Sequence, residues 1–86
     1  MLIKILDNEF SLSASSNTTV NNAVVVRLAH VGSQEHLITI ADGAGSNIGS
    51  FTLLDNSELI LEKRKTDTLQ VDSGTDVKVV SVAYKN

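Results

Sequence analysis

The sequence predicts an all-β fold, namely a small antiparallel β-sandwich of the jelly-roll-like or Ig-like kind with about seven to eight short strands. Apolar residues alternate with a period of two, and no window shows the three-to-four spacing of an amphipathic helix. Clusters of Gly, Asn, Asp and Ser recur at the spacing expected between strands of a sandwich or barrel. The 86 residues suit one domain, which we expect to span residues 1–86.

The first part of the chain alternates between apolar and polar stretches. Residues 2–6 form a short apolar run, and residues 9–12 place Phe10 and Leu12 on one face of a strand. Residues 13–19 are polar, so any helix should be a turn or two within residues 13–22. We expect residues 1–22 to form an N-terminal arm or an added strand.

The middle of the chain predicts two consecutive strands. Residues 23–31 are the most β-branched stretch, and Ile38 and Ile40 share one face of residues 36–41. Because only the polar turn 32–35 separates them, these strands are predicted to form a hairpin.

The second half continues the same pattern. Strands are predicted at 48–54, 58–63, 68–71 and 77–85. The stretches between them are rich in residues that form turns, and residues 42–47 are the most glycine-rich of these. This glycine-rich turn is expected to be a hairpin loop.

Composition limits the classes of function. The net charge is −3, whereas a nucleic-acid-binding domain of this size usually carries a basic excess. An anionic membrane surface is disfavoured for the same reason, and no apolar run approaches the ~20 residues that span a bilayer. The N-terminal residues do not resemble a signal peptide. We therefore expect no nucleic-acid partner and no membrane partner.

The core has few large side chains, with no Trp, one Tyr and two Phe. The chain has no Cys, so neither disulfides nor thiolate metal ligands can add stability. Small domains of this kind often depend on oligomerisation or on a partner. A homo-oligomer is therefore expected.

The sequence contains no recognisable catalytic motif. There is no Cys nucleophile and no G-x-S-x-G, and the carboxylates form no distinguishable acid–base pair. The glycines Gly43, Gly45 and Gly49 lead into a strand, whereas a phosphate cradle needs a helix N-terminus behind it. We expect no enzyme activity, no catalytic residue and no cofactor.

Two histidines flank the polar turn 32–35. In the predicted hairpin, His30 and His36 lie near one another, and with Glu35 they could ligate zinc. The favoured interpretation is that both histidines end core-facing series near the rim, so no metal site is expected.

Three cations stand side by side at Lys63, Arg64 and Lys65. Glu58, Glu62 and Asp67 balance their charge, and no aromatic residue nearby could stack a base. The triplet is predicted to be a solvated corner after strand 58–63. As an interface it could pair with carboxylates of a neighbouring subunit.

Residues 23–86 resemble small β-rich structural proteins encoded by tailed bacteriophages. The resemblance lies in a V-R strand, an I-T strand, an I-G-S-x-T-L segment and an I-x-K-x-x-x-D-T-L segment. The matching positions are Val26, Arg27, Ile38, Thr39, Ile48, Gly49, Ser50, Thr52, Leu53, Ile60, Lys63, Asp67, Thr68 and Leu69.

This resemblance implies a non-enzymatic virion component, assembled in the host cytoplasm and bound to capsid or tail structural proteins. A capsid decoration subunit is the leading hypothesis, and a neck, tail or fibre-associated subunit is the nearest alternative. A carbohydrate-binding or adhesive module is a further alternative, although Tyr84 is the one Tyr available to stack on a sugar. We also expect Tyr84 to be a candidate interface residue.

Overall fold

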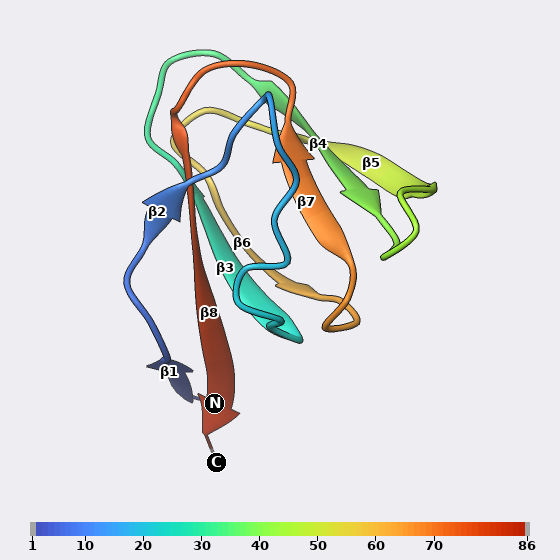
Figure 1. The fold of residues 1–86 in the computed structure, drawn as a ribbon. Helices are drawn as coiled ribbons and strands as arrows, with labels where there is room; N and C mark the ends of the chain where they lie inside the picture. Colours follow the sequence, from blue (N-terminus) through green and yellow to red (C-terminus); the bar gives the residue numbers. More distant parts are fainter. Residues whose placement is uncertain (1, 86) are drawn as a thin grey trace.

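The computed structural model describes the backbone of residues 2–85 and the side chains of residues 3–83, and it confirms the predicted all-β sandwich. Residues 2–85 contain no helix, and their strands form two antiparallel sheets (Figure 1). The strands are β1 Leu2–Ile5, β2 Phe10–Ser11, β3 Val25–His30, β4 His36–Ala41, β5 Asn47–Leu53, β6 Glu58–Glu62, β7 Thr68–Val71 and β8 Val77–Lys85.

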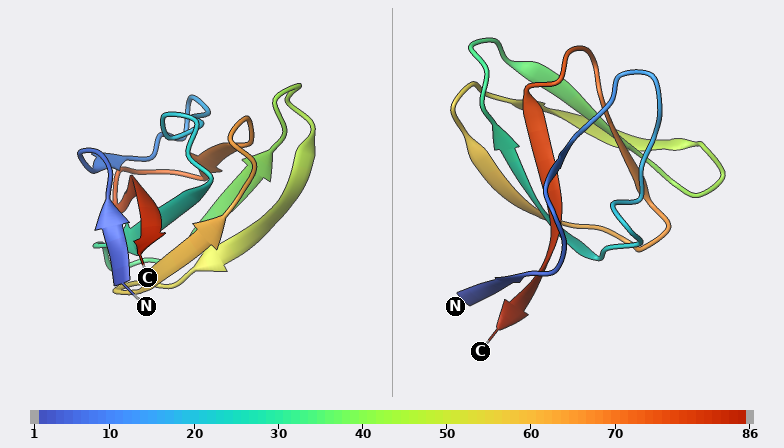
Figure 2. Two further views of the ribbon diagram at one scale, coloured as in Figure 1. Left: turned by 90° about the horizontal axis from the view of Figure 1, so that it is seen from below. Right: turned by 60° about the vertical axis from the view of Figure 1, so that its left-hand side comes forward.

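Strand β8 organises the larger, five-stranded sheet. It pairs with β3 on one side and with β1 and β2 on the other, and β6 follows β3 at the far edge. The smaller sheet has the order β5-β4-β7. The two sheets form a flat particle of 34 × 32 × 19 Å, and Figure 2 shows them as separate layers.

The predicted hairpin between residues 23–31 and 36–41 is wrong. β3 belongs to the larger sheet and β4 to the smaller one, so residues 31–35 cross between the sheets. The reason is that β8 and β6 occupy both edges of β3: the amide of Val31 donates to the carbonyl of Asp76, and that of His30 donates to Ser57, each at 2.9 Å. A short polar turn marks a loop, but it does not determine whether its flanking strands pair with each other.

The main core lies between the two sheets. It is built from alternate residues of the strands together with two residues of the N-terminal segment, and its buried members are Leu12, Val20, Val26, Leu28, Ile38, Leu53, Leu69, Val71, Val77 and Val79. Burial of these aliphatic side chains is the main favourable contribution to folding.

A second apolar cluster lies on the outer face of the larger sheet. Val25, Val80 and Val82 are buried there, and Ile60 packs against them. Arg27 shares this face, where its guanidinium contacts Glu58 and lies 3.4 Å from Glu9. Because β3 and β8 bury apolar side chains on both faces, their sequences contain consecutive valines rather than a strict alternation.

Residues 13–22 run along the free edge of β7. Thr18 and Leu69 exchange two main-chain hydrogen bonds, and the amide of Val71 donates to Ser13. Residues 13–22, the segment in which a short helix was considered, contain no helix. The N-terminal segment is instead held by the burial of Leu12 and Val20 in the main core.

Candidate functional site

The three consecutive cations occupy very different environments. Lys63 is buried at 7% exposure, and its Nζ donates to the carbonyls of Ala23, at 2.7 Å, and Arg64, at 3.3 Å. Burial lowers the pKa of the Lys63 ammonium, and attraction to the Asp67 carboxylate partly opposes this. The prediction of a fully solvated corner is therefore wrong for Lys63, because Lys63 continues the inward-facing series of Leu59 and Leu61.

Asp67 closes the turn that follows Lys63. Its side chain is buried, and its Oδ2 accepts hydrogen bonds from the backbone amide of Arg64 at 3.1 Å and from Arg64 Nε at 3.4 Å. The amide of Asp67 donates in return to the carbonyl of Arg64. A carboxylate that bonds local backbone in this way fixes a turn.

Two cations of the corner remain accessible. Arg64 and Lys65 are exposed, so both could meet a neighbouring subunit, as the interface prediction requires. The side chain of Tyr84, the other predicted interface residue, lies outside the described residues.

The two histidines form a buried pair at the end of the sandwich where residues 31–35 cross between sheets. The rings of His30 and His36 stack with centroids 5.0 Å apart and planes 22° apart. His30 Nδ1 accepts a hydrogen bond from the amide of Gly32 at 3.0 Å, so its Nε2 carries the proton and donates to the carbonyl of Gln34. Both nitrogens of His30 are thus occupied.

His36 faces two carboxylates from the loop between β7 and β8. Its Nδ1 bonds Asp72 Oδ1 at 2.8 Å, while its buried Nε2 has no hydrogen-bond partner and lies 3.7 Å from Asp76 Oδ2. A Cβ on Gly32 would lie 2.2 Å from Asp76 Oδ2, so Asp76 can approach only because residue 32 is glycine.

The pKa of Asp72 is lowered in the folded protein. Desolvation by itself would raise the pKa of Asp72, but hydrogen bonds from His36 and from backbone groups of Leu37 and Ser73, together with the charge of His36, lower it. The stacking of His30 on His36 therefore links the two sheets, and the carboxylate–imidazole hydrogen bond holds the start of the β7–β8 loop against β4. Among residues 3–83, no group of three or more His, Cys, Asp or Glu side chains is placed to hold a metal ion.

The glycine-rich turn joins β4 to β5 as the predicted hairpin loop. The Asp42 carboxylate accepts hydrogen bonds from the amides of Ala44 and Ser46, each at 2.9 Å. These backbone donors, which a phosphate would need, are therefore already bonded within the chain.

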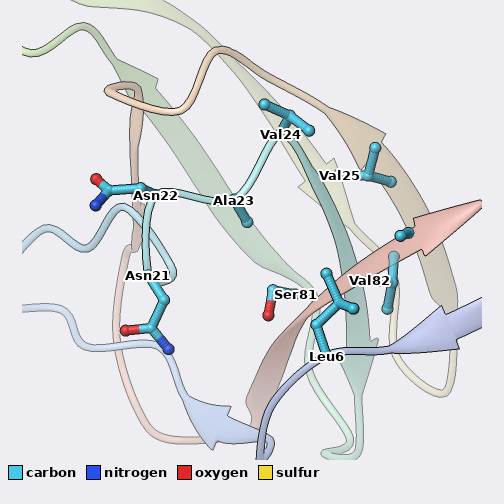
Figure 3. A pocket seen from close by; sticks show the side chains of 9 residues that line it. Leu6, Asn21, Asn22, Ala23, Val24, Val25, Ser81 and Val82 are labelled. Carbon is cyan, nitrogen blue, oxygen red and sulfur yellow. The ribbon is translucent and has the colours of Figure 1, made fainter.

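An apolar hollow lies beside the end of β8. It has a volume of about 460 Å³ and is lined by Leu6, Asn21, Asn22, Ala23, Val24, Val25, Ser81, Val82 and Ala83 (Figure 3). Leu6 and Val24 are more than half exposed, while Val25 and Val82 form its buried floor. Val24 falls within the predicted strand 23–31, but it precedes β3 and lines the hollow instead.

The rim of the hollow has an unusual backbone. Val20, Asn21 and Asn22 have φ angles of 56°, 57° and 58°, which is the left-handed region. L-residues rarely adopt this conformation in succession, and β-branched residues almost never do. The complete burial of Val20 holds the turn in place, together with hydrogen bonds that the amides of Val20 and Asn22 donate to Oγ1 of Thr18 and Thr19.

A two-stranded extension borders the hollow. β1 pairs with residues 82–85 of β8, beyond the last residue of β8 that pairs with β3. We call this extension the terminal ribbon; Figure 1 shows it at the lower end of the molecule. Ile3 and Ile5 on it are 39% and 54% exposed, so apolar surface continues from the hollow onto the ribbon.

Sequence reasoning missed the hollow, because its lining comes from three separate segments. The consecutive apolar residues 23–26 gave a partial signal, since one strand cannot direct all of them to a single face.

The described part of the chain contains no helix of the length and hydropathy that a membrane span requires. Comparisons with family models, with curated proteins and with solved structures find no match for this chain.

Proposed function

We propose that this domain is a non-enzymatic structural subunit of a tailed-phage particle, of the capsid-decoration type, and that it acts by binding neighbouring protein subunits. The observation that carries the proposal is the apolar surface formed by the hollow and the terminal ribbon. Ile5, Leu6 and Val24 are each more than half exposed there. Contiguous exposed apolar surface rimmed by polar residues is typical of protein–protein contacts.

The terminal ribbon would be stabilised if a partner covered this surface. An isolated pair of short strands is only marginally stable in water, and Ile3 and Ile5 of the terminal ribbon are exposed to solvent. An apolar side chain of a neighbouring subunit, inserted into the hollow, would bury Leu6 and Val24 and hold the ribbon. A standard interface buries about 800 Å² per partner.

The exposed cations would add specificity to such a contact. Arg64 and Lys65 lie on a loop whose turn is fixed by Asp67, so their backbone is already ordered before binding. Charges at the rim of an interface mainly guide association and select partners. Acidic surfaces of neighbouring capsid or tail subunits would be the matching chemistry.

The direct test is to purify particles of a phage that carries this gene and to analyse their proteins by quantitative mass spectrometry. We expect the chain in stoichiometric amounts, and labelling in electron micrographs should place it on the head. Absence from purified particles would refute a virion role, and labelling at the neck or tail would refute the decoration assignment.

A matched pair of substitutions tests the surface itself. Val24→Asp should lower incorporation into particles roughly tenfold, because it buries a charge in the proposed contact. Val31→Asp is the control, since Val31 is equally apolar, 61% exposed and located at the histidine end. Equal incorporation of both folded variants would contradict the use of this surface.

A further inference from the structure

β5 is the edge of the smaller sheet. A register shift interrupts its ladder at Ile48, but from Gly49 to Leu53 it lacks the charges and the covering segment seen at the neighbouring edges. In the described residues it pairs only with β4, and it lies at the outer rim in the left view of Figure 2. Its residues Asn47–Leu53 contain no charge and no proline. β6, the edge of the other sheet, begins and ends with Glu58 and Glu62, and residues 13–18 cover the edge of β7.

The register identifies which groups of β5 are free. The amide of Asp72 donates to the carbonyl of Leu37, so Leu37 and Thr39 direct their main-chain groups toward β7. The alternation of an antiparallel ladder then directs those of Ile38 toward Phe51 on β5. The main-chain groups of Ser50 and Thr52 consequently point away from β4 toward the open edge, whereas Ile48 lies at the register shift opposite Ile40 and Ala41.

The sequence of β5 is complementary to itself around Ser50. In an antiparallel pair centred there, Ser50 faces Ser50 of the second copy, so their free main-chain groups meet in a hydrogen-bonded pair. Thr52 then faces Ile48, which lies at the register shift of the other copy. On the other face of the strand Gly49 faces Phe51. A Cβ at Gly49 would meet nothing within 4 Å, so the space above it is open for the Phe51 ring of the other copy.

We propose that two copies of this chain associate through β5, antiparallel and two-fold symmetric about Ser50. The pairing extends the smaller sheets of both copies into one continuous sheet and covers Ile48, which is 52% exposed in the single chain. β6 cannot pair in the same way, because two copies would bring Glu58 opposite Glu62. This inference does not depend on the proposed function, and the isolated protein suffices to test it.

The absence of cysteine from the chain allows a direct test by cross-linking. Ser50→Cys should form a covalent dimer under mild oxidation, because facing residues of a hydrogen-bonded pair have Cα atoms about 5.5 Å apart, within disulfide range. Thr52→Cys lies opposite Ile48 of the other copy rather than opposite itself, and Ser73→Cys lies on an exposed turn outside β5. Both should cross-link at least about tenfold more slowly, which is the margin expected of a specific contact over random collision.

A second measurement is the mass in solution by sedimentation or light scattering. The wild type should dimerise with concentration, and Ser50→Lys should be monomeric while keeping its β-type circular dichroism, since it places two cations opposite each other. Ser73→Lys, with the same charge change, should still dimerise. A wild type that stays monomeric at all concentrations would overturn the proposal, as would cross-linking of Thr52→Cys or Ser73→Cys as fast as Ser50→Cys.

Discussion

The Asp72 carboxylate, which contacts His36, makes the free energy of unfolding depend on pH in the acidic range. Its folded pKa is lowered, so its charged form favours the folded state. This contribution is fully present above the ordinary value of 3.8 and is lost as the pH falls through the lower folded value.

We therefore expect Asp72→Asn to unfold at a lower denaturant concentration than the wild type at pH 7, with a gap that narrows below about pH 4. Asp55→Asn, on an exposed turn without a hydrogen bond to histidine, is the control. Urea titrations at several pH values measure the gap. A gap that stays constant down to pH 2.5 would show that the His36 contact does not stabilise the charged carboxylate.

Lys63 and Lys65 are two positions apart, but they should differ in their importance for folding. Lys63→Met removes two hydrogen bonds to main-chain carbonyls and leaves the buried Asp67 without a nearby ammonium, so it should lower the free energy of unfolding by about 1–3 kcal/mol.

Lys65→Met, at an exposed position, should change the free energy by no more than about 0.5 kcal/mol. Chemical denaturation of both variants gives the comparison. A larger loss for Lys65→Met would mean that the buried and exposed members of the triplet have been wrongly assigned.

At the scale of elements, the turn at residues 20–22 is the most strained connection described. Asn tolerates the left-handed region better than other non-glycine residues, whereas a β-branched residue does not. Val20 is the exception, and its complete burial in the main core compensates for its backbone conformation.

Asn22→Val lacks this compensation, because residue 22 is exposed with φ of 58°. We expect it to lower the free energy of unfolding by about 1–2 kcal/mol. Asn17→Val, at an exposed loop position with no positive φ, should have little effect in the same thermal or chemical melts. Equal stability of the two variants would indicate that the turn relaxes to an ordinary conformation at no cost.

Strand positions could be predicted from the sequence because alternation is a local property. The predicted ranges 36–41 and 68–71 coincide with β4 and β7, and 58–63 exceeds β6 by one residue. Strand partners could not be predicted, since pairing depends on which distant edges are satisfied, as the failed hairpin between β3 and β4 shows.

At the scale of the whole molecule, the candidate sites were predicted less well than the fold. The proximity of His30 and His36 was expected, but the reason was wrong: they meet across the two sheets rather than within a hairpin. The burial of Lys63 had a local signal, because it follows Leu59 and Leu61 at a period of two. A charged side chain at the end of such a series was expected to be exposed to solvent. Lys63 is buried instead, because main-chain carbonyls accept hydrogen bonds from its ammonium group.

The placement of β8 also has a consequence for how the chain acquires its fold. It is the last of the eight strands in sequence but occupies the middle of the larger sheet, between β3 and the pair β1 and β2. During translation β3 can pair with β6, but β1, β2 and the other edge of β3 must wait for residues 77–85 to emerge from the ribosome. Contacts this distant in sequence close slowly, so the nascent chain carries open strand edges for much of its synthesis and should benefit from a chaperone.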